Sequence, residues 1–164
     1  MKANSQDKEI LALLKHNARM SAREIAGRLN STPAKIEAAI ARMEQDGALL
    51  GYTAITANET AGDEVRAIIE VQVQPERENG FNKVAQQLAH FDEVVSVYLV
   101  SGRYDLHLEV VGRSLQEVAH FVASKLATQS GVKSCATLFL LKKYKEAGIE
   151  LDKEEKYERL KVVP

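Results

Sequence analysis

The segment SGRYD at residues 101–105 groups side chains and backbone that could bind a small charged molecule. An amino acid needs an acceptor for its ammonium group and N–H donors for its carboxylate. Asp105 could be the acceptor, and a turn containing Gly102 could expose its backbone N–H groups as an anion-binding concavity. Arg103 could add a positive charge, and Tyr104 could pack on a side chain. Alternatively, the segment is only a hairpin turn in which Gly102 takes a positive φ.

Strand-like segments flank this turn on both sides. Residues 94–100 (VVSVYLV) have the composition of a β-strand. Residues 106–111 (LHLEVV) alternate apolar and other side chains, which is the period of a half-buried strand. The five residues are therefore expected at the tip of a β-hairpin.

Residues 64–144 alternate strand and helix patterns around that hairpin. Apolar residues recur at helical spacing in two segments, and Ser114 with Glu117 forms a capping box before the second. The order is βαββαβ, the ferredoxin-like arrangement, in which both helices cover one face of a four-stranded antiparallel sheet. The other face would be bare and apolar, so we expect dimerisation through it. The expected segments are Val65–Gln74, Gly80–Ala89, Val94–Val100, Leu106–Val111, Leu115–Leu126 and Val132–Leu141.

The stretch from Ser21 to Gly47 predicts two helices joined by a tight turn. Ser21 can cap the first helix, because Glu24 completes a capping box three residues later. Thr32 offers an N-cap hydroxyl for the second helix, and Pro33 suits its first position. This is the layout of a helix-turn-helix, whose second helix enters the DNA major groove. An αα-hairpin in any small helical domain would show the same pattern.

Further elements are expected on either side of this pair. A helix over Asp7–His16 is needed, because two helices alone could not enclose a core. Residues 48–55 (ALLGYTAI) are strand-like and bounded by glycines, so we expect a wing strand that leads into a linker. The polar segment Asn58–Asp63 marks the expected domain boundary. The expected centre of the helical core is Leu14, Ile25, Leu29, Ile36 and Ile40.

The composition is that of an ordinary globular protein. Of the 164 residues, 45% are hydrophobic and 27% charged, and the net charge is −1. Residues 1–60 hold eight Lys or Arg and seven Asp or Glu, which is weak support for DNA binding. No stretch has the length of a membrane span, and residues 1–20 lack the apolar region of a signal peptide. A cytoplasmic protein is therefore expected.

A helix-turn-helix followed by a βαββαβ domain, in this order and at this length, resembles the Lrp/AsnC family of bacterial and archaeal transcription regulators. DKEILALLKHNARMSAREIAGRL is similar to the family's first two helices, and ARMEQDGALLGYTA to the end of its recognition helix and the strand after it. LVSGRYDLHLEV is similar to the hairpin of its regulatory domain, with Gly102 and Asp105 in a Gly-x-x-Asp turn. The resemblance implies an α+β chain. Its parts would be a winged helix-turn-helix at residues 1–60, a ferredoxin-like regulatory (RAM) domain at residues 61–144, and a charged tail at residues 145–164.

The resemblance also implies partners. These are double-stranded DNA, a free amino acid bound between regulatory domains, and further copies of the chain in dimers, tetramers or octamers. It favours ligand binding at the turn over a purely structural turn. The expected effector-binding residues are Ser101, Gly102, Arg103, Tyr104, Asp105 and Thr137. The expected DNA-facing residues are Ser31, Thr32, Lys35, Ala38 and Arg42, with Arg19, Arg23 and Arg28 as phosphate contacts.

The recognition helix departs from the family in its charge. The family usually carries several Arg or Lys residues on the exposed face, and each lost phosphate contact weakens affinity for DNA. The chain could gather weak contacts in a multimer, read a site by DNA bending, or have reduced DNA activity. A DNA-silent amino-acid sensor that acts in mixed oligomers is an alternative. On the exposed face of the recognition helix, this chain has Glu37, Ala38, Ala39 and Ala41, and only Lys35 and Arg42 are basic.

Candidate catalytic groups are scattered. None of the four histidines stands at a metal-ligand spacing with another His, Cys or Asp. Cys135 lies in an apolar run and is expected to be a small core residue. We therefore expect a non-enzymatic protein without cofactor or metal. One enzymatic alternative is a sirohaem decarboxylase, a class that shares the two-domain layout without DNA binding, and in it His107 could face the tetrapyrrole.

Overall fold

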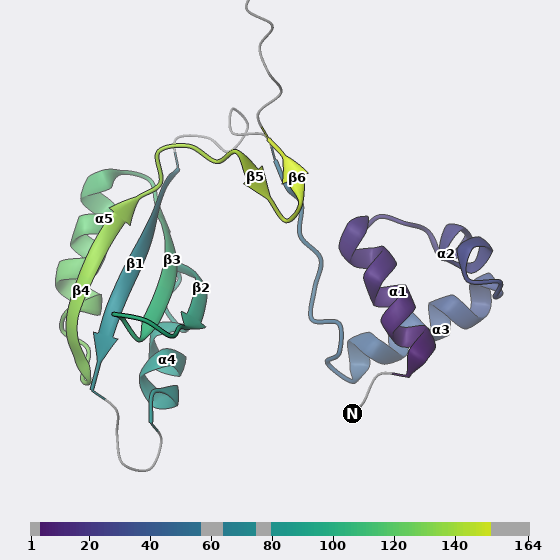
Figure 1. Cartoon of the computed structure of the whole chain (residues 1–164), viewed down its shortest axis with the longest axis horizontal. Coiled ribbons are helices and arrows are strands. Elements are labelled where there is room, and N and C mark those ends of the chain that lie inside the picture. The colour runs from purple at the N-terminus through teal and green to yellow at the C-terminus, as the bar shows by residue number, and fades with distance from the viewer. Residues whose placement is uncertain (1–3, 57–63, 75–79, 152–164) are drawn as a thin grey trace, which may run out of the picture. The chain divides into compact units, whose positions relative to one another are not determined.

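The structure, a computed structural model, describes residues 4–56, 64–74 and 80–151 (Figure 1). The chain divides into two compact units, Met1–Ala54 and Ile55–Pro164, each with its own hydrophobic core. The segment Asn58–Asp63, where a domain boundary was expected, lies outside the described residues. None of the helices in the described ranges is both long and apolar enough to cross a membrane.

The first unit is built from three helices, each opened by a polar side chain. They are α1 (Ser5–His16), α2 (Ala22–Arg28) and α3 (Pro33–Gln45). Asn4, Ser21 and Thr32 accept the backbone N–H of the third helical residue of α1, α2 and α3 respectively, which satisfies a donor that the helix leaves free. The expected caps at Ser21 and Thr32 are therefore confirmed.

One apolar cluster joins the three helices. All five residues expected at its centre belong to it, with Leu29 and Ile40 packed at its margin. Gly47 follows α3 with φ +68°, a conformation that glycine adopts without strain, so the expected helix end is also confirmed. The buried members are Ile10, Leu14, Met20, Ile25, Ala26, Ile36 and Met43.

The prediction of a wing strand at residues 48–55 is wrong for the single chain. The backbone of these residues forms no strand, and the Leu50 side chain is 92% exposed. A strand needs a neighbour to complete its hydrogen bonds, and among the described residues no other segment pairs with this one. The composition of residues 48–55 indicates a strand, but it does not show whether a neighbouring strand is present.

The second unit contains a four-stranded antiparallel sheet in the order β2-β3-β1-β4. Helices α4 (Asn82–Leu88) and α5 (Leu115–Phe121) pack against one face of the sheet (Figure 1). A short π-helix at Val122–Leu126 continues α5. The βαββαβ order and the placement of both helices are as expected. The strands are β1 (Val65–Val73), β2 (Val94–Leu99), β3 (Leu106–Gly112) and β4 (Val132–Phe139).

Alternation along β1 and β3 assigns side chains to the two faces of the sheet. On β1, every second residue from Ala67 to Val73 is buried beneath the helices. On β3, Leu106, Leu108 and Val110 are buried in the same cluster. The intervening residues therefore project from the opposite face, which we call the open face.

The open face is more polar than expected. Arg66 on β1 pairs with Glu109 on β3 at 3.0 Å, and Glu70 on β1 lies 4.0 Å from His107 on β3. These charged pairs occupy the middle strands, while the exposed apolar residue Leu138 lies on the edge strand β4. The expectation of an apolar bare face is wrong at its centre, where these polar pairs lie, although Ile68 on β1 and Val111 on β3 also project from this face.

A small hairpin follows the sheet, formed by β5 (Lys145–Glu146) and β6 (Ile149–Glu150). Ala147 and Gly148 both take a positive φ at its tip, as a two-residue turn requires. This hairpin lies within residues 145–164, for which the sequence predicts a charged tail. The rest of the expected charged tail, residues 152–164, lies outside the described residues.

Candidate functional site

The expected DNA-facing residues of α3 lie at the surface of the helical unit. Thr32, Lys35, Ala38 and Arg42 are exposed, and Ser31 is half-buried. Lys35, Ala38 and Arg42 share one side of α3, because they are spaced by three and four residues. The hydroxyl of Thr32 also caps α3 through the Lys35 N–H at 3.4 Å. The structure thus places Lys35, Ala38 and Arg42 on one side of α3, with Ser31 and Thr32 directly before the helix.

Arg42 differs from the others because it holds a buried partner. Its Nη2 donates to Oδ1 of Asp7 on α1 at 2.6 Å, and Asp7 is only 2% exposed. The first turn of α1 also approaches the turn before α3, where Gln6 Nε2 donates to Ser31 Oγ at 3.4 Å. Asp7 is not among the residues predicted from the sequence, because it lies 35 residues from Arg42 along the chain.

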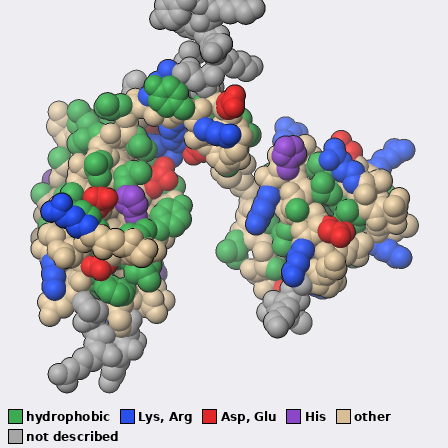
Figure 2. Space-filling view, in the orientation of Figure 1, with side chains coloured by type: hydrophobic (Ala, Val, Ile, Leu, Met, Phe, Trp, Pro, Cys, Tyr) green, Lys and Arg blue, Asp and Glu red, His purple; other side chains and the backbone are tan. Residues whose placement is uncertain are grey.

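The remaining expected phosphate contacts are exposed cations outside α3. Arg23 and Arg28 lie on α2, and Arg19 lies in the loop before it. Figure 2 shows Lys and Arg side chains spread over the helical unit with Asp and Glu among them. No broad basic patch gathers in that view, in keeping with the near-neutral sequence.

The turn between β2 and β3 borders a pocket of about 380 Å³. Four of the expected effector residues line it, from Ser101 to Tyr104. The guanidinium of Arg103 lies 5.7 Å from the centre of the Tyr104 ring, which is a cation–π distance. The turn is held at its base, because the Val100 N–H donates to the Asp105 carbonyl at 2.9 Å.

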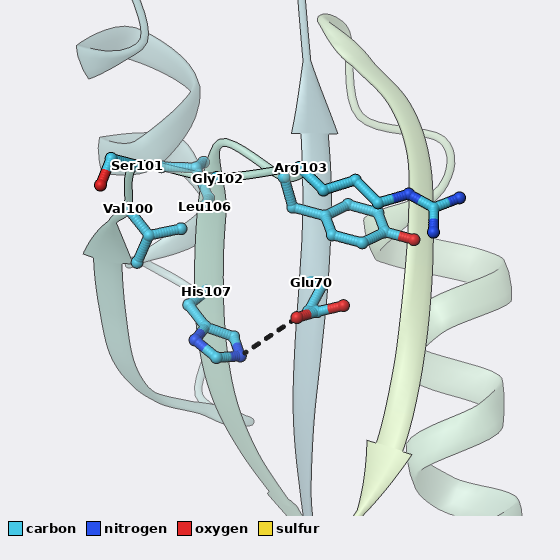
Figure 3. A pocket seen from close by; sticks show the side chains of 8 residues that line it. Glu70, Val100, Ser101, Gly102, Arg103, Leu106 and His107 are labelled. Atoms are coloured by element: carbon cyan, nitrogen blue, oxygen red, sulfur yellow. Dashed lines mark ion pairs between the residues drawn. The ribbon is translucent and has the colours of Figure 1, made fainter.

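Two residues of the open face also line this pocket, and neither is among the effector residues predicted from the sequence. Glu70 and His107 are direct partners in the register of β1 and β3, and Figure 3 shows their side chains facing each other. Each is about one-third exposed. The pocket thus combines a carboxylate, an imidazole, a guanidinium and the backbone of a glycine-containing turn. The pairing of Glu70 with His107 depends on strand register and has no local sequence signal.

Two expected effector residues lie outside the pocket lining. The Oδ2 of Asp105 accepts the backbone N–H of Val73 on β1 at 2.8 Å, so this carboxylate is used within the sheet. Thr137 pairs with Ile69, which is buried beneath the helices, and paired residues share a face. Thr137 is therefore on the face opposite Glu70.

The described residues contain no group of three or more His, Cys, Asp or Glu arranged to hold a metal ion. Cys135 is half-buried against the sheet core. Burial raises the pKa of its thiol, which disfavours the reactive thiolate. The side chain therefore behaves as a small apolar residue.

Family comparisons match both units. Residues 66–149 match the Lrp/AsnC ligand binding domain, and residues 4–49 match a winged helix-turn-helix DNA-binding domain. The chain is 37% identical to the HTH-type transcriptional regulator YugG of Bacillus subtilis, over 100% of both chains. It is 28% identical to the regulatory protein AsnC of Haemophilus influenzae, over 82% of this chain and 89% of that protein.

Solved structures share the fold. AsnC of E. coli matches with a TM-score of 0.63 and 24% identity, over 87% of this chain and 95% of that one. A Neisseria meningitidis transcriptional regulator solved in complex with L-methionine matches with a TM-score of 0.68 and 23% identity, over 92% and 98%. Because the matching families and relatives are transcriptional regulators, the expectation of a regulator rather than an enzyme is confirmed. The chain belongs to the Lrp/AsnC family of DNA-binding transcriptional regulators.

Proposed function

We propose that the chain is a transcriptional regulator whose DNA affinity or oligomeric state responds to a free amino acid bound at the pocket beside the β2–β3 turn. The observation that carries this proposal is the presence of opposite charges on that pocket. Glu70 offers an acceptor for an ammonium group, and Arg103 offers a donor for a carboxylate. A zwitterion needs both charges at one site, and both residues line this pocket.

Each pocket residue has a proposed part in holding the ligand. The backbone N–H groups of the turn from Ser101 to Tyr104 join Arg103 in binding the carboxylate. Glu70 takes the ammonium group in place of Asp105, whose side-chain oxygen is engaged with Val73. Asp105 contributes by fixing the turn to β1. Thr137, on the other face, supports the sheet without touching the ligand.

Ligand binding and assembly are coupled in this proposal by the open face. Glu70 and His107 project from that face, so a second copy that packs against it would cover the pocket. The exposed apolar side chains Tyr98 and Leu138 give such a copy something to bury. A ligand enclosed between copies stabilises the assembly by mass action, which links ligand concentration to oligomeric state. Dimers that assemble into tetramers or octamers then present several helix-turn-helix units to one stretch of DNA.

The proposed DNA contacts are Ser31, Thr32, Lys35, Ala38 and Arg42 on and before α3, with Arg23 and Arg28 on phosphates. Because α3 carries few cations, each unit binds weakly, and affinity comes from joining units in the oligomer. Exposed alanines at positions 38 and 41 favour a second candidate, a DNA-silent sensor that acts in mixed oligomers. Such a sensor would bind an amino acid and leave no footprint on any promoter.

The experiment that tests the proposal titrates the full-length protein with each of the twenty amino acids while sedimentation and DNA binding are recorded. The proposal expects at least one amino acid to shift both the assembly equilibrium and the affinity for DNA. An identical assembly and identical DNA affinity with and without all twenty would overturn it. Amino-acid binding without any affinity for DNA would favour the DNA-silent sensor.

A further inference from the structure

The buried carboxylate of Asp7 joins the first helix of the helical unit to the recognition helix. Its Oδ2 accepts the backbone N–H of Asn4 at 3.1 Å, and its Oδ1 accepts Nη2 of Arg42 at 2.6 Å. Asp7 is 2% exposed, and it is the one polar residue among the buried residues described. The carboxylate therefore has two partners, one at the N-cap of α1 and one on α3.

Arg42 keeps donors for a further partner. A guanidinium has five N–H donors, and the contact with Asp7 is made by Nη2 alone. The side chain of Arg42 is 48% exposed, so part of the guanidinium faces water. Lys35 lies on the same side of α3, and none of the described contacts pairs it with a buried carboxylate. Arg42 is thus a surface cation whose position is fixed by the buried carboxylate of Asp7.

Releasing Arg42 from Asp7 would leave a buried negative charge without its partner. Removal of one member of a buried ion pair is strongly destabilising for this reason. Arg42 therefore approaches DNA from one orientation and does not swing freely as a solvated arginine does. The conformational entropy of its long side chain has been lost on folding, so binding does not lose it again.

We propose that Asp7 is a positioning residue for DNA binding: it holds the Arg42 guanidinium so that its outward N–H groups meet a DNA phosphate. The inference rests on DNA binding by the helical unit. It gives a role in DNA binding to an acidic residue on α1, outside the two helices of the motif. A carboxylate that only neutralised Arg42 would have the opposite effect, and its removal would strengthen binding.

The test measures binding of the full-length protein to a labelled duplex of mixed sequence by fluorescence anisotropy at several salt concentrations. Asp7→Asn is expected to weaken binding about 2- to 12-fold per unit, because Arg42 must then be ordered on the DNA. Arg42→Ala is expected to weaken binding and to reduce the salt slope by about 0.9. Adding Asp7→Asn to Arg42→Ala should cause no further loss, because the anchor then has nothing to hold.

Asn4→Ala is the matched control on the same turn of α1. It removes the side-chain cap, in which Asn4 Oδ1 accepts the Asp7 N–H at 2.7 Å, and it retains the Asp7 carboxylate. A lower melting temperature with unchanged DNA affinity is expected. If Asp7→Asn does not fold, Arg42→Lys replaces it, because lysine keeps the charge but loses the planar fork. That variant should bind more weakly with an unchanged salt slope.

DNA binding by Asp7→Asn that equals or exceeds that of wild type would overturn the inference. It would also be overturned if the losses of affinity in the two single variants simply added in the double variant, or if Arg42→Lys kept the affinity of wild type. Weaker binding by Asn4→Ala that matches the loss in Asp7→Asn would reduce Asp7 to a residue that only stabilises the fold. A wild-type protein that binds no duplex even at low salt would contradict DNA binding itself. The two failures are therefore distinguishable.

Discussion

The carboxylate of Asp105 points back into the sheet, where its Oδ2 accepts the backbone N–H of Val73 at 2.8 Å. Val73 is 2% exposed, so this donor has no access to water. The Asp105 N–H in turn donates to the Val71 carbonyl at 3.0 Å. These two bonds attach the β2–β3 turn to the end of β1 and hold the turn over the pocket.

Replacement of Asp105 is therefore expected to destabilise the second unit. Asp105→Ala leaves the Val73 N–H buried without an acceptor, which costs about 1–3 kcal/mol of unfolding free energy. Arg103→Ala on the same turn should change that free energy by less than about 0.5 kcal/mol, because its side chain is at the surface. Urea unfolding of both variants checks this prediction, and equal stability of the two would contradict it.

Glu70 is expected to control affinity for the amino acid. Glu70→Gln keeps the size of the side chain and removes the charge that we propose binds the ammonium group. We expect affinity to fall by about 10-fold or more, in the range of a lost charge-assisted hydrogen bond. Glu109→Gln is the matched control on the same face, because Glu109 pairs with Arg66 and does not line the pocket. Calorimetry with the amino acid that binds wild type best gives both values, and equal losses would contradict the assignment.

Local and non-local features differ in how far the sequence predicts them. The caps at Ser21 and Thr32 join residues three positions apart, so their pattern is complete within a short window of sequence. The Glu70–His107 pair depends on the register of two strands, and the Arg42–Asp7 pair spans 35 residues. Neither pair leaves a local signal. The wing strand was predicted from composition, but a strand also needs a neighbour, and composition does not provide one.

The capping box of α2 is expected to contribute stability that depends on pH. The Ser21 hydroxyl and backbone N–H both donate to Glu24, at 2.6 and 2.8 Å, and these bonds lower the pKa of Glu24. Because the folded pKa is the lower one, the contribution is present above about pH 4.3, the usual glutamate value. It is lost as the pH falls through the lowered folded pKa.

Glu24→Gln should therefore be less stable than wild type at neutral pH, and the difference should shrink below about pH 4. Melting temperatures measured from neutral to acid pH check this. Glu37→Gln, at an exposed position of α3, is the control. A difference between Glu24→Gln and wild type that does not vary with pH would show that the charge of Glu24 is irrelevant to the cap.

Gly112 at the end of β3 has no room for a side chain. A Cβ there would lie 2.9 Å from Cγ2 of the buried Val118 on α5. Gly112→Ala is expected to lower the free energy of unfolding by about 1–3 kcal/mol, as overpacking in a core does. Gly27→Ala is the opposite case, because a Cβ inside α2 meets nothing within 4 Å. It should stabilise the helical unit by up to about 1 kcal/mol, and thermal unfolding that ranks the two variants the other way would contradict the packing described.

We propose that a weakly basic helix-turn-helix and an amino-acid pocket act together in this regulator. The most direct test is a footprint of the full-length protein on the DNA upstream of its own gene, repeated with a mixture of the twenty amino acids. We predict a protected region at low salt whose extent or half-saturation concentration changes when the mixture is added. No protection at any salt concentration, or protection that the mixture leaves unchanged, would contradict the claim.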